Sequence, residues 1–187
     1  MMNSSLAEQA YDLVNSKAQS NSFIHGFSGI LGFITTIAAD VATIPAIYGK
    51  MWDEVRAVYG HKPVGSEAAK TVLMQVMPEV LSDIAFDKIL GNVPIVGIYF
   101  NAICAKQMAW RLGTLFAFMS ARGSEIPSDK VAEAMALIRH MFPQKDMFAF
   151  TTPNKHNFIK LVESVEGNSI QQFEKKVSNA LELLSKN

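Results

Sequence analysis

The chain has 187 residues, which is long enough for one domain with a sizeable core. It carries 17 basic and 17 acidic residues, so its formal net charge is zero, which argues against a nucleic-acid-binding module with its usual basic face. Cys104 is the sole cysteine, which excludes an intrachain disulfide framework. Hydrophobic residues make up 49% of the chain and the mean hydropathy is +0.15, values between those of a soluble domain and a polytopic membrane protein.

Helical spacing of apolar residues runs through nearly the whole chain, and no alternating strand pattern competes with it, so an all-α fold is predicted. The face of the first predicted helix consists of Leu6, Ala10, Leu13 and Val14. The N-terminal sequence lacks the basic and apolar regions of a secretion signal, so we expect a cytoplasmic protein.

The first of two apolar stretches runs from Phe23 to Tyr48, with Asp40 as its only charge, and Pro45 breaks it. Thr43 as N-cap and Pro45 in the first turn predict that a new helix begins there. The apolar face of this helix consists of Ile44, Ile47, Tyr48, Met51, Val55 and Val58, and Gly60 is expected to end it.

The next predicted helix has Ser66 as its cap, is kinked or divided by Pro78, and ends near Leu90. The second apolar stretch follows from Ile89 to Ala105 and continues, after Lys106 and Arg111, from Leu112 to Ala121. Pro94 breaks this stretch, and the pattern then predicts one long helix from about Ile95 to Ala121, stopped by Arg122 and Gly123.

Three further helices are predicted in the C-terminal third. Ser128 is expected to cap the first of them, which Pro143 ends, and residues 143–152 form a linker. Thr152 and Pro153 open the second, with Ile159, Val162 and Val165 inward and Gly167 as its stop. The last has a coiled-coil-like seam of Ile170, Phe173, Val177, Leu181 and Leu184. The chain is thus predicted to be a single bundle of seven or eight helices with two apolar central segments broken by proline.

Both apolar stretches are short for membrane spans, which need about 20 predominantly apolar residues. The part from Phe23 to Ala39 falls slightly short, and extending it to Tyr48 encloses Asp40 at a cost of roughly 3 kcal/mol. The part from Ile89 to Ala105 is also short. Two interpretations stay open: insertion into a bilayer as a re-entrant hairpin or two short spans, and burial as the central helices of a soluble bundle.

No catalytic signature is apparent, whether a GxSxG motif, a kinase set or a Cys-His pattern. The histidines lack a second ligand at zinc-site spacing, so neither a metal site nor a cofactor is expected; they are His25, His61, His140 and His156. The glycines at 26, 29 and 32 lack the lysine and hydroxyl of a phosphate loop and indicate helix packing. Cys104 is interpreted as a buried small hydrophobe.

Asp40 is the charge that the pattern singles out. As a structural residue it would be the N-cap of the segment that contains Pro45. As a functional residue it would be an acid inside a membrane or cavity, paired with Lys106 or Arg111. An enzyme site around Asp40, His25 and Lys106 is the least favoured hypothesis, because such groups need a mutual geometry that sequence does not define.

Two blocks of the chain resemble the EcsC-like family. In the first block, a glycine-rich apolar stretch leads to an acidic residue, a proline and a helix ending in Tyr-Gly: GFSGILGFITTIAADVATIPAIYGKMWDEVRAVYG. In the second, a Pro-x-x-Gly stretch is followed by an asparagine and a small-residue helix: GNVPIVGIYFNAICAKQMAWRLGTLF. The same residues are similar to the membrane-associated domain of unknown function appended to some bacterial GTPases. The resemblance covers about residues 23–121.

This resemblance implies a bacterial, helical protein in a family without established catalytic residues. The positions that match the family pattern are Gly29, Gly32, Asp40, Pro45, Tyr59, Gly60, Pro94, Gly97 and Asn101. It divides the single domain, residues 1–187, into an EcsC-like core at 23–121 and C-terminal helices at 128–187. The first block is more polar than in many members, at His25, Thr35 and Thr36, which argues against full membrane spanning.

Two functional hypotheses follow. The first is a non-enzymatic EcsC-like helical protein that is associated with the inner face of the cytoplasmic membrane and acts through a protein partner. The alternative is a soluble helical bundle whose central apolar helices enclose a lipid or another hydrophobic ligand.

Overall fold

A computed structural model of the chain describes residues 4–28, 48–65, 67–76, 96–124, 126–142 and 149–185. These residues form seven helical segments and contain no strand, so the predicted all-α fold is confirmed. The segments are α1 (Leu6–Ser28), residues 48–58, residues 67–76, α4 (Val96–Arg122), α5 (Ser128–Met141), α6 (Lys155–Val165) and α7 (Ile170–Ser185).

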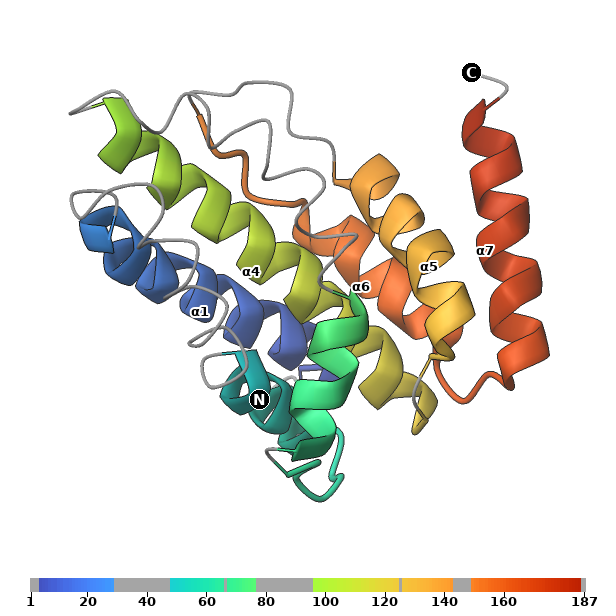
Figure 1. The fold of residues 1–187 in the computed structure, drawn as a ribbon. Helices are drawn as coiled ribbons and strands as arrows, with labels where there is room; N and C mark the ends of the chain where they lie inside the picture. The colour runs from blue at the N-terminus through green and yellow to red at the C-terminus, as the bar shows by residue number, and fades with distance from the viewer. Residues whose placement is uncertain are drawn as a thin grey trace.

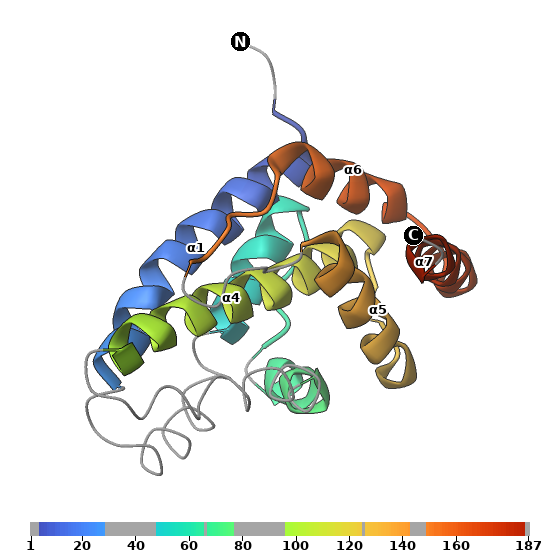
Figure 2. The same ribbon diagram turned by 90° about the horizontal axis from the view of Figure 1, so that it is seen from above.

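The centre of the fold is the antiparallel pair of α1 and α4, the two longest helices, which pack against each other more extensively than any other pair among α1 and α4 to α7. Figures 1 and 2 show both helices side by side, with the last turns of α1 next to the first turns of α4. The helices α5, α6 and α7 gather towards the opposite end of the pair (Figure 1).

A glycine allows α1 and α4 to approach closely. Gly113 lies in a row of small residues spaced four apart along α4, which comprises Ala105, Ala109, Gly113, Ala117 and Ala121. At Gly113 the approach is tightest, since a Cβ there would lie 2.5 Å from Cγ1 of Val14 in α1. Val14 is fully buried, so this contact determines how the two helices align along their axes.

The buried face of α1 differs in part from the predicted one. Ala10 and Val14 are fully buried as predicted, but Leu6 is 41% exposed, and the face is completed by Ala7, Tyr11 and Ala18. The helix also continues to Ser28, so the start of the first apolar stretch belongs to this first helix and not to a separate element.

The segment 48–58 packs into the core as its apolar pattern predicts. Tyr48, Met51 and Val55 are buried and Val58 is partly buried, whereas Ile44 and Ile47 of the predicted face lie outside the described residues. Trp52 stacks on Phe116 of α4 with ring centroids 5.2 Å apart. Gly60 ends this segment as predicted, with a φ of 74°. The amide of His61 donates to the carbonyl of Arg56 and that of Gly60 to the carbonyl of Ala57, which is the Schellman pattern of a glycine-terminated helix.

The prediction for α4 is confirmed at its C-terminus, since the helix ends at Arg122 and Gly123 follows with a φ of 74°. The caps of α5 and α6 were predicted wrongly. Pro127, not Ser128, is the N-cap of α5, and no side chain caps that helix. The N-cap of α6 is Asn154, whose side chain accepts a hydrogen bond from the amide of Asn157. In both cases the cap lies one or two residues from the position predicted.

The ends of α4 and α6 are joined through their main chains. The amide of Gly167, which follows α6 with a φ of 63°, donates to the carbonyl of Ala121 at 3.1 Å. Nearby, the guanidinium of Arg122 lies 4.8 Å from the centre of the Phe173 ring of α7. Phe173 and Val177 of the predicted seam are buried, so α7 is held at this end of the molecule.

Candidate functional site

The antiparallel packing brings parts of the two apolar stretches together. Residues 18–28, at the C-terminal end of α1, contain no Asp, Glu, Lys or Arg, and neither do residues 96–105, at the N-terminal end of α4. These helix ends, distant in sequence, lie at the same end of the pair (Figures 1 and 2). We call them together the uncharged end, and it is the candidate site.

Two of the family-pattern positions fall within the uncharged end. Gly97 and Asn101 lie in the first two turns of α4. Five others, Gly29, Gly32, Asp40, Pro45 and Pro94, lie outside the described residues, as do Thr43, Ser66 and Pro78. The predicted pairing of Asp40 with a basic residue of α4 is therefore untested.

Tyr59 and Gly60, the remaining pattern positions, lie away from the uncharged end. The Tyr59 hydroxyl is buried and has no hydrogen-bond partner within the described part of the chain. Burial raises the pKa of this phenol strongly, and the nearby carboxylates of Glu166 and Glu163 raise it further. Tyr59 thus stays neutral and contributes to packing against the end of α6, while Gly60 supplies the left-handed turn described above.

The two basic residues predicted to pair with Asp40 both lie on α4. Lys106 is half-buried, and its Nζ lies 5.9 Å from the centre of the Phe150 ring. Arg111 is half-buried and lines a small cleft with Gln107, Trp110, Ile138, Phe142, Phe150 and Pro153. The space in this cleft that a water molecule can occupy is about 10 Å³, which is close to the minimum for one water.

The histidines and the cysteine are distributed over several elements of the described part of the chain. His61 makes a 2.8 Å hydrogen bond through Nε2 with the carbonyl of Ser120, near the C-terminal end of α4. His140 and His156 are exposed, His25 lies on α1, and Cys104 lies on α4. Within the described ranges, no group of three or more His, Cys, Asp or Glu side chains is arranged to hold a metal ion.

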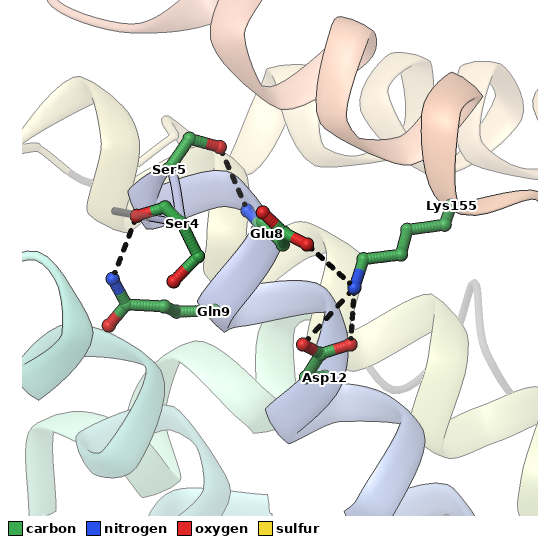
Figure 3. A network of polar contacts seen from close by, with 6 residues as sticks. All are labelled: Ser4, Ser5, Glu8, Gln9, Asp12 and Lys155. Atoms are coloured by element: carbon green, nitrogen blue, oxygen red, sulfur yellow. Dashed lines mark hydrogen bonds and ion pairs between the residues drawn. The ribbon is translucent and has the colours of Figure 1, made fainter. Parts of the chain in front are cut away.

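The opposite end of α1 carries a cluster of charges, which Figure 3 shows. Lys155, the first residue of α6, forms ion pairs with Glu8 at 3.0 Å and with Asp12 at 2.9 Å. Its hydrogen bonds to Asp12 and Glu8 raise the pKa of the Lys155 ammonium. Ser5 caps α1: its hydroxyl accepts a hydrogen bond from the backbone amide of Glu8, three residues later, at 3.2 Å.

Beneath this cluster lie the aromatic rings that join α1, α4 and α6. The ring of Tyr11 lies 5.1 Å from that of Trp110 and 5.4 Å from that of Phe158, and Trp110 and Phe158 are 6.0 Å apart. The Tyr11 hydroxyl donates to the carbonyl of Pro153 at 2.8 Å, and Lys155 Nζ lies 5.5 Å from the Tyr11 ring centre. Burial raises the pKa of Tyr11. We call Tyr11, Trp110 and Phe158 the aromatic cluster.

Sequence reasoning missed the residues that align and join the long helices. Tyr11, Trp110 and Phe158 were outside the predicted faces, and Gly113 was not singled out. A signal for Gly113 was present, since small residues recur at every fourth position from Ala105 to Ala121. Such a repeat marks a helix face that approaches another helix closely.

Comparison with known proteins gives no relative for this chain: no family model, no curated protein and no solved structure matches it. The resemblance to the EcsC-like family therefore stays a prediction. In the part of the chain that the structure describes, no helix has the length and apolar character needed to cross a membrane.

Proposed function

We propose that this chain is a non-enzymatic helical protein that associates with a membrane surface through its uncharged end and acts through a protein partner. The observation that carries the proposal is the meeting of two charge-free helix ends, 18–28 and 96–105, at one end of the α1 and α4 pair. The EcsC-like resemblance of residues 23–121 and the inner face of the cytoplasmic membrane as location are parts of the same proposal.

The physical reason is the cost of taking charge into a bilayer. A charged side chain deep in the hydrocarbon costs several kcal/mol, whereas uncharged helical segments enter the interface without that cost. The sequences of the two helix ends contain apolar and aromatic residues of the kind that interfacial helices bury; these are Phe23, Ile24 and Phe27 in the first and Ile98, Tyr99 and Phe100 in the second. Shallow association of this kind needs no membrane-spanning helix.

The partner is assigned to the opposite end because charged side chains are exposed there. Lys160 and Glu163 of α6 and Lys175 and Lys176 of α7 are exposed. With the uncharged end at the membrane, these helices would face the aqueous phase, where a partner can reach them and these side chains would lie at the polar rim of the interface.

Flotation with phosphatidylcholine vesicles tests the membrane part of the proposal. The native chain should float with the vesicles, and Phe23→Lys, which places a charge in the uncharged end, should stay at the bottom of the gradient. Leu6→Lys is the matched control, because it adds the same charge to an exposed position about 26 Å away on the same helix.

The proposal fails if the native chain floats neither with these vesicles nor with vesicles that also contain phosphatidylglycerol, or if both variants float as it does. Thermal unfolding of each variant separates loss of binding from loss of fold. If native mass spectrometry instead shows one lipid bound stoichiometrically to a chain that does not float, the alternative of a lipid-binding bundle replaces the membrane-surface proposal.

A further inference from the structure

Lysines stand at the boundaries of both charge-poor stretches of the sequence. The stretch 18–49, whose only charge is Asp40, is preceded by Lys17 and followed by Lys50, and the uncharged stretch 89–105 is preceded by Lys88 and followed by Lys106. Three of these four residues, Lys17, Lys50 and Lys106, belong to described helical segments. The structure shows how these three lie relative to the uncharged end.

The positions of Lys17 and Lys106 follow from the alignment of α1 and α4. Since Val14 of α1 lies against Gly113 of α4 and the helices are antiparallel, Lys106 is level with about residue 21 of α1. Lys17 lies four residues further from the uncharged end, which is about 6 Å along the axis. Each is the first charged residue met on its helix when one moves inward from the uncharged end.

Lys50 is placed by one contact of the segment 48–58 and by one contact of the loop that follows it. Near the end of α4 remote from the uncharged end, His61 bonds to Ser120, whereas Glu54 forms an ion pair with Lys17 at 2.6 Å. The segment therefore runs away from the uncharged end as its residue numbers rise. Lys50 lies one turn before Glu54, about 6 Å closer to the uncharged end, and its side chain is exposed.

The three lysines thus form a basic rim, which we call the lysine collar, around the inner limit of the uncharged end. Two acidic residues lie near it. Glu54 pairs with Lys17, whose side chain is 29% exposed, so this pair has no net charge and the positive charge of the collar comes from Lys50 and Lys106. Asp53 accepts a hydrogen bond from the amide of Val64. In the next segment, where Ala69 lies against Gly49, exposed Glu67 and Lys70 contribute one charge of each sign.

We infer that the membrane recognised by this chain is rich in anionic phospholipids, with the lysine collar contacting their phosphate groups while the uncharged end enters the interface. This inference rests on the proposed function and adds the chemistry of the partner. Lysines extend long flexible stems towards headgroups from the edge of an apolar region. A collar on three helical segments would also orient the α1 and α4 pair with its uncharged end towards the bilayer.

The test compares vesicles of phosphatidylcholine alone with vesicles that also contain phosphatidylglycerol, at about 0.15 M salt. The native chain should partition more strongly into the anionic vesicles. The double variant Lys50→Gln and Lys106→Gln should lose about thirtyfold in partitioning into them, since each lysine near an anionic surface is worth about fivefold. Lys17 is left unchanged in order to preserve its ion pair with Glu54.

The matched control is Lys160→Gln with Lys175→Gln, which removes the same charge from exposed positions on α6 and α7. This control should partition as the native chain does. If both double variants lost about thirtyfold, the net charge of the chain and not the lysine collar would explain the binding. Equal binding of the native chain to both kinds of vesicle would also overturn the collar while leaving the proposed function intact. Absence of binding to either kind would remove both.

Discussion

The two ends of α1 differ in how they are used, although they belong to one continuous helix. Its N-terminal half carries Glu8 and Asp12, which pair with Lys155, and Tyr11, which packs in the aromatic cluster. Its C-terminal part, from Ala18 to Ser28, carries no charge. Charge at the N-terminal end of this helix is thus placed where α6 meets it, and charge is absent where the helix meets the uncharged start of α4.

The ion pairs and the aromatic contacts that join α6 to α1 differ in how much they stabilise the fold. The ion pairs of Lys155 with α1 lie at the surface, where water and salt weaken such pairs (Figure 3). Phe158 is fully buried between α1 and α4. Burial of a phenylalanine side chain is worth roughly 1.5–3 kcal/mol, so aromatic packing, more than charge, holds α6 in place.

The largest effect is expected from removing the ring that α6 contributes to the aromatic cluster. Phe158→Ala should lower the free energy of unfolding by about 3–5 kcal/mol, because it combines lost burial with a cavity between three helices. Chemical denaturation measures this change. His156→Ala, on the exposed face of the same helix, is the control and should change stability little. Similar losses in both variants would contradict the assignment of α6 docking to the aromatic cluster.

The second prediction concerns the alignment of α1 against α4. Gly113→Ala places a methyl group 2.5 Å from Val14, and overpacking of this kind costs about 1–3 kcal/mol, partly offset by a gain in helix propensity of up to about 1 kcal/mol. A net loss of stability is therefore expected. Gly49→Ala is the control: its Cβ would meet Ala69 at 3.4 Å, near ordinary contact, so it should be neutral or stabilising.

A double-mutant cycle makes this second prediction specific to the contact. Val14→Ala removes the methyl groups that meet residue 113, so Gly113→Ala should be less harmful, by about 1 kcal/mol, in the Val14→Ala background than in the native chain. Additive losses would show that Val14 does not limit the approach of the two helices.

The smallest effect is expected at the charged end. Lys155→Met removes both ion pairs and the ammonium group that lies over the Tyr11 ring, while keeping an unbranched side chain of similar length, so only a slight, salt-sensitive loss of stability should follow. Because folding raises the pKa of Lys155, its contribution is complete below the ordinary lysine pKa of about 10.4 and disappears as the pH rises through the folded-state value. Denaturation at neutral pH in low and high salt, and again at alkaline pH, measures this dependence. A difference between native chain and variant that stays constant with salt would contradict it.

The sequence predicted helices well where local chemistry determines them. Helices end as expected at Gly60, Gly123 and Gly167. Each of these residues has a positive φ, which glycine adopts without steric strain. The apolar face of the segment 48–58 was also predicted, since helical spacing is a local property. The N-caps of α5 and α6 were displaced by one or two residues, because Ser, Asn and Pro near a helix start compete for similar positions.

Long-range contacts were beyond local reasoning. Nothing near Tyr11 in sequence indicates that its hydroxyl meets the carbonyl of Pro153, 142 residues away, or that Lys155 meets Glu8. The sequence indicated the uncharged end only in part. The two apolar stretches were evident from the sequence, but their meeting depends on the antiparallel pairing of α1 and α4. The pairing of Asp40 and the remaining pattern positions stay predictions.

The contact of Val14 with Gly113 has a geometric consequence at a distance. Moving α1 by one turn along α4 would bring Val14 opposite Ala109 or Ala117, each of which carries the methyl group that Gly113 lacks. The pair therefore has one preferred register. That register fixes how far the last turn of α1 extends relative to the first turn of α4, about 20 Å from the contact. Because Gly113 lacks a Cβ atom, α1 and α4 align so that the two helix ends that we propose to meet the membrane lie at the same level.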